Sequence, residues 1–86
     1  MQPEQIARLI EAGIPGSIAV VDGDGTHFTA VVVSDEFEGK PPVQRHRIVY
    51  EALGKRMGTE IHALSMQTYT PAQWQSRRPK DGAREG

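Results

Sequence analysis

The sequence contains no cysteine. The chain by itself therefore cannot form a disulfide, a thiolate metal site or a cysteine nucleophile. Any metal that it binds must be held by histidine or carboxylate side chains, or by ligands from a partner protein. A strong positive charge is missing as well, because the formal net charge is −1. This balance argues against a domain that depends on strong non-specific binding of nucleic acid.

Long apolar runs are also missing from the chain. The longest stretches, at residues 18–21 and 30–33, are far too short to cross a membrane. Residues 1–4 lack the basic and apolar regions of a signal peptide. We therefore expect a cytoplasmic protein without membrane association. Since 86 residues bury only one modest core, we expect a binding domain and not an enzyme with a large internal pocket.

The hydrophobic pattern predicts six elements in the order helix, strand, strand, helix, strand, helix. The turn signal DGDG at residues 22–25 joins the first two strands as a β-hairpin. Thr70 and Pro71 are typical of the cap and first turn of a short final helix. Residues 35–42 are expected to form a polar loop. The expected helices cover residues 3–12, residues 43–57 and the surroundings of Trp74, and the expected strands cover residues 17–22, 26–34 and 60–68.

These elements predict one domain at residues 1–76. Residues 77–86 consist of Arg, Pro, Lys, Asp, Gly, Glu and one Ala, and this composition predicts a disordered tail. The second strand, second helix and third strand form a β-α-β unit, which joins parallel strands by a right-handed crossover. The prediction is therefore an α/β fold in αββαβα order, with a three-stranded mixed sheet covered on one face by helices.

Two of the three histidines are expected to meet. His27 opens the second strand and His62 opens the third. If these strands are parallel neighbours, about 4.8 Å apart, both histidines lie at the same edge of the sheet. Such a pair is a candidate two-ligand metal site that a partner would complete. The alternative is that both are ordinary surface or edge residues, and spacing alone leaves it open.

The third histidine, His46, is expected to have a structural role. The second helix must run antiparallel to its flanking strands, which places His46 roughly 16 Å along the helix axis from the end nearest the other two histidines. It also belongs to an apolar stripe that is predicted to face the core. We therefore expect a buried, hydrogen-bonded histidine. The stripe consists of Val43, His46, Val49, Tyr50, Leu53 and Met57.

Two features relate to phosphate binding. Residues 13–16, GIPG, formally match the G-x-x-G loop with which KH domains clamp phosphates, but the middle residues include no basic side chain. Basic residues instead gather on and around the second helix. They form either a solvated helix face or a patch for phosphate or an acidic partner. These residues are Lys40, Arg45, Arg47, Lys55 and Arg56.

Four stretches of the sequence together resemble the BolA-like family in its histidine-loop form. The match runs in order from about residue 3 to residue 76. The stretches are FEGKPPVQRHRIVY at residues 37–50, IHAL at residues 61–64, YTPAQW at residues 69–74 and the hairpin GDGTHF at residues 23–28.

The resemblance implies a class II KH-like fold without a functional G-x-x-G loop. It also implies a partner, because BolA-like proteins associate with monothiol glutaredoxins in iron–sulfur cluster trafficking and iron homeostasis. In such a heterodimer a [2Fe-2S] cluster bridges the two proteins, and the glutaredoxin supplies a cysteine thiolate and bound glutathione. By resemblance, His62 and His27 are the ligands from this chain. The isolated chain is expected to hold no cluster.

The resemblance also implies an alternative function. Bacterial BolA-like proteins are described as DNA-binding transcriptional regulators that affect the stress response and cell morphology. In that case the second helix and the third strand would face DNA. Salt separates the two functions, because DNA affinity falls steeply with salt concentration. DNA is thus an open candidate partner. A weak homodimer is also left open by the sequence.

Overall fold

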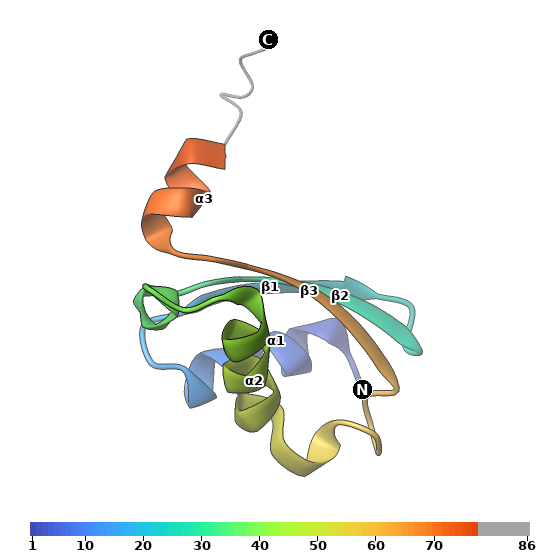
Figure 1. The fold of residues 1–86 in the computed structure, drawn as a ribbon. Coiled ribbons are helices and arrows are strands. Elements are labelled where there is room, and N and C mark those ends of the chain that lie inside the picture. The colour runs from blue at the N-terminus through green and yellow to red at the C-terminus, as the bar shows by residue number, and fades with distance from the viewer. Residues whose placement is uncertain (78–86) are drawn as a thin grey trace, which may run out of the picture.

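The computed structural model describes residues 1–77, which contain three helices, three strands and two short 3-10 turns (Figure 1). The predicted order of elements is confirmed. The elements are α1 (Pro3–Gly13), β1 (Ile18–Gly23), β2 (His27–Val33), η1 (Asp35–Phe37), α2 (Pro42–Leu53), η2 (Gly54–Arg56), β3 (Ala63–Tyr69) and α3 (Pro71–Arg77).

The bounds of the second helix and the third strand differ most from those predicted. The second helix ends at Leu53 because Gly54 adopts a positive φ of 61°, and the 3-10 turn η2 follows. The third strand starts only at Ala63. Arg77, the first residue of the predicted tail, is the last residue of α3, and its guanidinium lies 5.2 Å from the centroid of the Tyr69 ring. The rest of the predicted tail, residues 78–86, lies outside the described residues.

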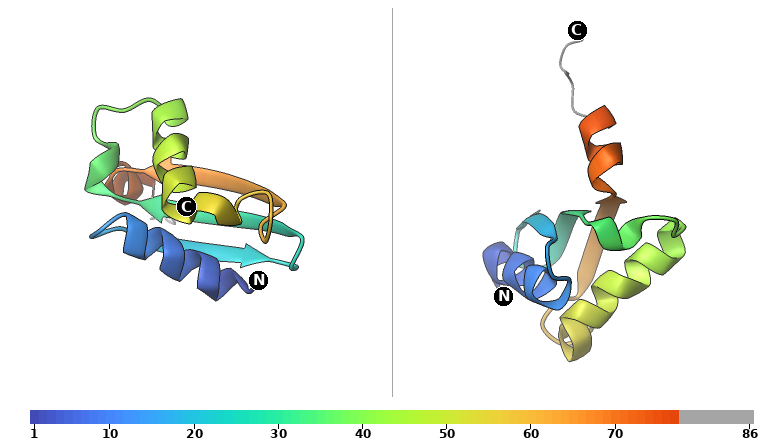
Figure 2. Two further views of the ribbon diagram at one scale, coloured as in Figure 1. Left: turned by 90° about the horizontal axis from the view of Figure 1, so that it is seen from below. Right: turned by 90° about the vertical axis from the view of Figure 1, so that its left-hand side faces the viewer.

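The sheet has the strand order β1-β2-β3. β1 pairs antiparallel with β2, and β2 pairs parallel with β3, so the predicted mixed sheet and its β-α-β unit are confirmed. Helices α1 and α2 cover one face, as predicted, whereas α3 leaves from the other side (Figures 1 and 2). Each helix within residues 1–77 falls short of the length and hydrophobicity needed to span a bilayer.

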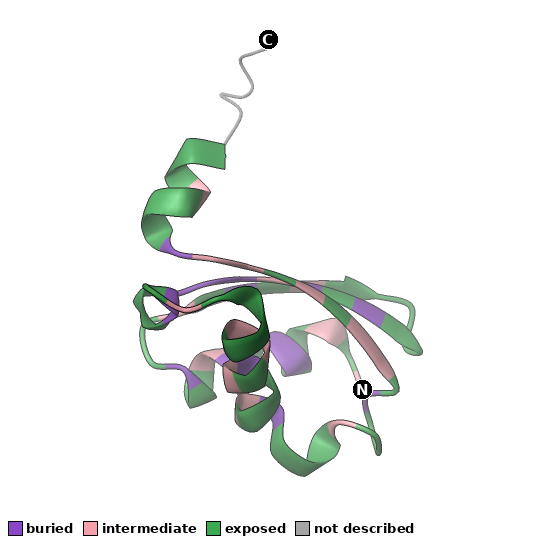
Figure 3. Cartoon of the chain, in the orientation of Figure 1, coloured by how far each residue is buried: buried purple, intermediate pink, exposed green. Residues whose placement is uncertain are grey.

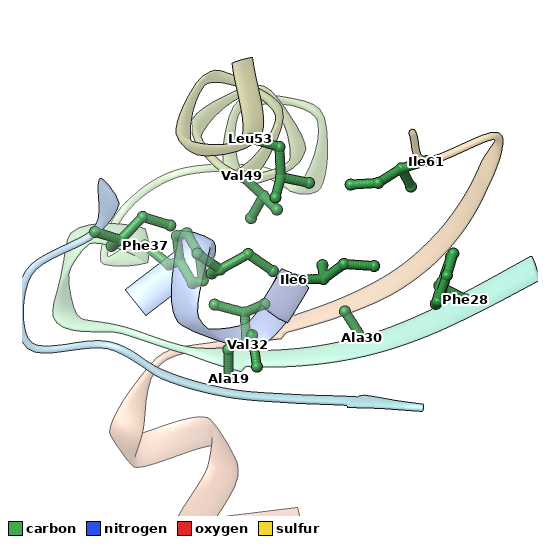
Figure 4. Packing of buried hydrophobic residues seen from close by; sticks show 12 residues of the cluster. Ile6, Ala19, Phe28, Ala30, Val32, Phe37, Val49, Leu53 and Ile61 are labelled. Atoms are coloured by element: carbon green, nitrogen blue, oxygen red, sulfur yellow. The ribbon is translucent and has the colours of Figure 1, made fainter. Parts of the chain in front are cut away.

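The core lies between the sheet and helices α1 and α2 (Figures 3 and 4). Phe28, Ala30 and Val32 alternate along β2 and point into it. Phe37, predicted to lie in a polar loop, is also fully buried. The backbone N–H of Glu36 donates to the Ser34 hydroxyl at 3.0 Å, which starts the 3-10 turn η1 and directs the chain so that Phe37 enters the core.

The predicted buried stripe of α2 is partly wrong. Val49 and Leu53 are buried, but Val43 is 68% exposed, Tyr50 is 41% exposed and His46 is only half-buried. The reason is the close crossing of α1 and α2, since a Cβ built on Gly13 would lie 2.6 Å from the Cβ of Ala52. This contact turns the Ala52 side of α2 inward. The other edge of the apolar stripe therefore faces solvent.

We predict that Gly13→Ala destabilises the fold by about 1–3 kcal/mol, although alanine is intrinsically the better helix former. The added methyl would meet both the Cβ of Ala52 and its Cα, which lies 2.9 Å away, so the two helices would have to separate. Denaturant unfolding measures the loss. Adding Ala52→Gly should recover part of it. An unchanged or higher stability of Gly13→Ala would show that the helices do not cross this closely.

We also predict that His46→Ala changes the free energy of unfolding by about 0.5 kcal/mol or less. The larger cost expected for a buried polar group does not apply, because the imidazole is half-buried and has no hydrogen-bond partner within residues 1–77. Leu53→Ala on the same helix is the matched comparison and should cost about 2–5 kcal/mol. Equal losses of unfolding free energy for the two variants would show that His46 is buried in the core.

Candidate functional site

The hairpin turn holds His27 at the start of β2. Asp24 Oδ1 accepts hydrogen bonds from the backbone N–H groups of Thr26 and His27, each at 2.9 Å. The Asp24 N–H in turn donates to the His27 carbonyl oxygen at 3.3 Å. Gly23 allows this close approach, because a Cβ at that position would lie 2.5 Å from the same carbonyl oxygen. The turn thus fixes the His27 backbone and leaves its side chain exposed.

The charge of Asp24 is part of this arrangement. The N–H groups of His27 and Thr26 stabilise the carboxylate, and they hold the pKa of Asp24 below its usual value. The nearby His27 side chain acts in the same direction. Asp24 therefore stays ionised near neutral pH and keeps the turn closed. The sequence indicated a turn here but not that this carboxylate positions His27.

His62 is positioned by a different device. Ile61, immediately before it, is fully buried and anchors the chain to the core. The Ile61 N–H donates to the Arg56 carbonyl oxygen, and the Gly58 N–H donates to the Ile61 carbonyl oxygen, both at 2.9 Å. These bonds tie the loop to the end of η2. His62 itself is exposed, and β3 begins at the next residue.

The sheet brings the backbones of His27 and His62 to the same end of the strands β2 and β3. In the parallel β2–β3 register, His27 pairs with Ala63, so His62 lies one residue from the partner position of His27. Neighbouring strands are about 4.8 Å apart. Figure 1 shows the hairpin turn and the start of β3 at one end of the sheet, away from α3. His46 lies outside this pair, on α2.

This pair has the chemistry of part of a metal site. Neutral imidazole is a common metal ligand, and two histidines replace two cysteines on one iron of Rieske-type [2Fe-2S] centres. Among the described residues, no group of three or more His, Cys, Asp or Glu side chains could hold a metal ion. Both histidines are exposed and can be reached by a partner. The donor set therefore fits a shared centre whose other ligands come from another protein.

The basic residues on and around α2 differ in their contacts, and Arg45 has the most. The Arg45 guanidinium donates to the carbonyl oxygens of Lys40 at 2.7 Å and Thr68 at 3.2 Å, and to Gln73 Oε1 at 2.8 Å. It also lies 5.8 Å from the centroid of the Phe37 ring. Arg45 thus ties the start of α2 to β3 and α3. Nothing in the sequence pattern distinguished this structural role from a surface charge.

The other four cations are more accessible. The Lys40 ammonium donates to the Glu36 carbonyl oxygen at 2.7 Å. Arg47 is exposed on α2, and Lys55 and Arg56 are exposed on η2, where Arg56 also forms a 3.7 Å ion pair with Glu60. The exposed cations therefore follow the outer side of α2 and its continuation.

One apolar surface was missed by sequence reasoning. Ile18 and Val20 are more than 60% exposed, on the face of the sheet that α1 and α2 leave open. With Val31, Val33 and Trp74 they line a hollow of about 330 Å³. Exposed and buried residues alternate at the start of β1, so one side of its apolar run faces solvent. This exposure was hidden because the apolar run at residues 18–21 reads equally well as a buried strand.

Comparison with known proteins gives consistent matches. A sequence model described as BolA-like protein matches residues 11–73. BolA-like protein 1 of Homo sapiens is 48% identical over 66 residues, which cover 77% of this chain and 48% of that protein. The DNA-binding transcriptional regulator BolA of Vibrio cholerae is 39% identical over 74 residues, which cover 86% of this chain and 67% of that protein.

The fold comparison agrees with the sequence comparison. The structure of a bolA protein homologue from Coxiella burnetii matches with a TM-score of 0.82 at 45% identity, over 87% of this chain and 97% of that chain. The chain spans about half the length of the mammalian relatives that it matches. Because the family model covers most of the described residues and the topology is the same, this chain belongs to the BolA-like family.

Proposed function

We propose that this chain is the partner of a monothiol glutaredoxin and that the two proteins jointly bind a bridging [2Fe-2S] cluster. The proposed role is iron–sulfur cluster trafficking and iron homeostasis in the cytoplasm. The chain would act by binding and not as an enzyme. The observation that supports this most directly is the parallel register, which brings the backbones of two exposed histidines to the same end of the sheet.

Each part of the site has a defined task in this proposal. His62 follows the buried Ile61, so its backbone is the more firmly anchored of the two. His27 depends on the Asp24 turn, which is exposed, and we therefore assign it the weaker ligand role. When bound, the cluster would supply a redox-active and transferable iron centre. Imidazole ligation raises its reduction potential relative to ligation by cysteine alone.

A second candidate function is DNA-binding transcriptional regulation, as in stress response and cell morphology. It is favoured by the name of the Vibrio cholerae relative and by the exposed cations of α2 and η2. Arg47, Lys55 and Arg56 are the residues that we assign to phosphate contact. The net charge of −1 argues for a weak, local interaction.

We predict that His62→Ala removes the distinctive visible absorption of the cluster-bridged heterodimer and leaves at most that of a glutaredoxin homodimer. His27→Ala should perturb the spectrum or hasten cluster loss without abolishing association. The measurement is anaerobic reconstitution with glutaredoxin and glutathione, followed by absorption and circular dichroism spectra over time.

His46→Ala is the matched control for these variants, because it removes the third imidazole from a position on α2. Its spectrum and cluster lifetime should equal those of the wild type. The chain reconstituted alone should stay colourless, because it offers two imidazoles and no thiolate. A wild-type spectrum and cluster lifetime for the His62→Ala complex would disprove the ligand assignment.

For the alternative function, we predict that any DNA affinity falls with salt and that Arg47→Gln and Lys55→Gln each reduce the slope of log K against log [salt] by about 1. Arg8→Gln on α1 is the control, since Arg8 is an exposed cation on another element. Fluorescence anisotropy with a labelled duplex at several salt concentrations measures the slope. Equal effects of the three variants would remove α2 and η2 as the DNA-facing surface.

A further inference from the structure

The outer face of the sheet carries an exposed apolar surface. We define the outer face as Ile18, Val20, Val31, Val33 and Trp74, the residues that line the 330 Å³ hollow. Ile18 is 62% exposed and Val20 is 64% exposed. Burial of such side chains is a main source of binding energy, and contiguous exposed apolar patches mark interaction sites.

The outer face is continuous with the surface around His27, one of the two candidate ligands. A second hollow, of about 600 Å³, is lined by His27 together with Asp22 and Asp24. Val20 and Val31 line this hollow as well as the first one. Both hollows therefore belong to one surface, which runs along β2 from His27 to Val33. At about 3.3 Å per residue this distance is about 20 Å.

The charges along this surface differ between its two ends. Asp22 and Asp24 flank His27 at the hairpin end. The described residues that line the hollow beside Trp74 are all uncharged. A complementary partner would therefore be apolar opposite Val20 and Val31, and basic opposite the hairpin. Within residues 1–77, a second copy of the same face supplies no lysine or arginine for those carboxylates, because the residues that line the two hollows include none.

The exposed edge of β1 is less suited to binding than the outer face. The Ala19 N–H already donates to Glu11 Oε2 at 3.1 Å, and the Gly23 N–H donates to Asp22 Oδ1 at 2.9 Å. Occupied edge donors are unavailable to an added strand. The surface that stays open next to β1 is its apolar side-chain face.

We propose that the protein that shares the His27–His62 site docks across the outer face. It lays an apolar element over Ile18, Val20 and Val31, and it presents a basic side chain to Asp22 and Asp24. This inference rests on the proposed function, since it names the docking surface of the same partner. In this proposal the exposed residues Val43 and Tyr50 of α2 do not contact the partner.

The test compares two surfaces with matched substitutions. Ile18→Thr/Val20→Thr makes the outer face more polar while keeping β-branched residues that suit a strand. Val43→Thr is the control, because Val43 is as exposed as Val20 but lies on α2. Calorimetric titration with a purified monothiol glutaredoxin that carries [2Fe-2S] and glutathione gives each Kd. The double variant should bind about tenfold more weakly or worse, and the control should bind within about twofold of the wild type; tenfold corresponds to about 1.4 kcal/mol.

A charge variant tests the basic side of the contact. Asp24→Asn keeps an oxygen that can accept the N–H bonds of Thr26 and His27 but removes the negative charge. Its binding should be weaker and less sensitive to salt than that of the wild type. Equal salt dependence of the two proteins would exclude a basic contact at the hairpin.

The outcomes separate this inference from the proposed function. If the wild type fails to bind the glutaredoxin, both fall. If the wild type binds with its mixed-ligand spectrum but Ile18→Thr/Val20→Thr keeps the wild-type Kd, the outer face is not the docking surface and the shared cluster stands. A loss confined to Val43→Thr would move docking to α2. Dissociation of a dimer of the chain alone by the double substitution, seen by sedimentation, would make the face a self-association surface and overturn the proposal.

Discussion

The parallel pairing of β2 with β3 determines where both candidate ligands lie. His27 and His62 are 35 positions apart in the chain, and only this pairing places them one residue apart in register. The same register aligns Phe28 with Leu64 on the core side, and the N–H of Ser34 donates to the carbonyl oxygen of Tyr69 at the far end, at 3.0 Å. A slip would therefore disturb core packing and the histidine pair together. Stability of the fold and geometry of the site have one common cause.

The two faces of the sheet have different roles because only two helices cover it. The face under α1 and α2 forms the core, whereas α3 leaves from the opposite side and contributes only Trp74 to the outer hollow. An exposed apolar face beside an open strand edge carries a risk of unwanted strand pairing. Glu11 reduces this risk by accepting the N–H of Ala19. The chain thus keeps an apolar surface available while occupying edge donors next to it.

Several charged and small residues act structurally where a surface role was the simpler interpretation. Arg45 joins three elements through its guanidinium, and Asp24 closes the turn that carries His27. Gly13 lets α1 and α2 approach at Ala52, which decides how α2 is turned about its axis. Because the Arg45 guanidinium is occupied, the accessible cations of this region are residues such as Arg47 and the cations of η2. The pair of histidines, His27 and His62, is the chemically most specific feature of the described residues.

The sequence by itself determined the order of elements, the hairpin and the parallel crossover, because turn signals and the β-α-β order are local or topological properties. It therefore also predicted that His27 and His62 share an edge. The orientation of α2 was decided only by tertiary packing, since periodicity identifies apolar stripes but not the one that meets α1. The same holds for the burial of Phe37, the contacts of Arg45 and the exposure of Val20, each of which depends on residues distant in the chain.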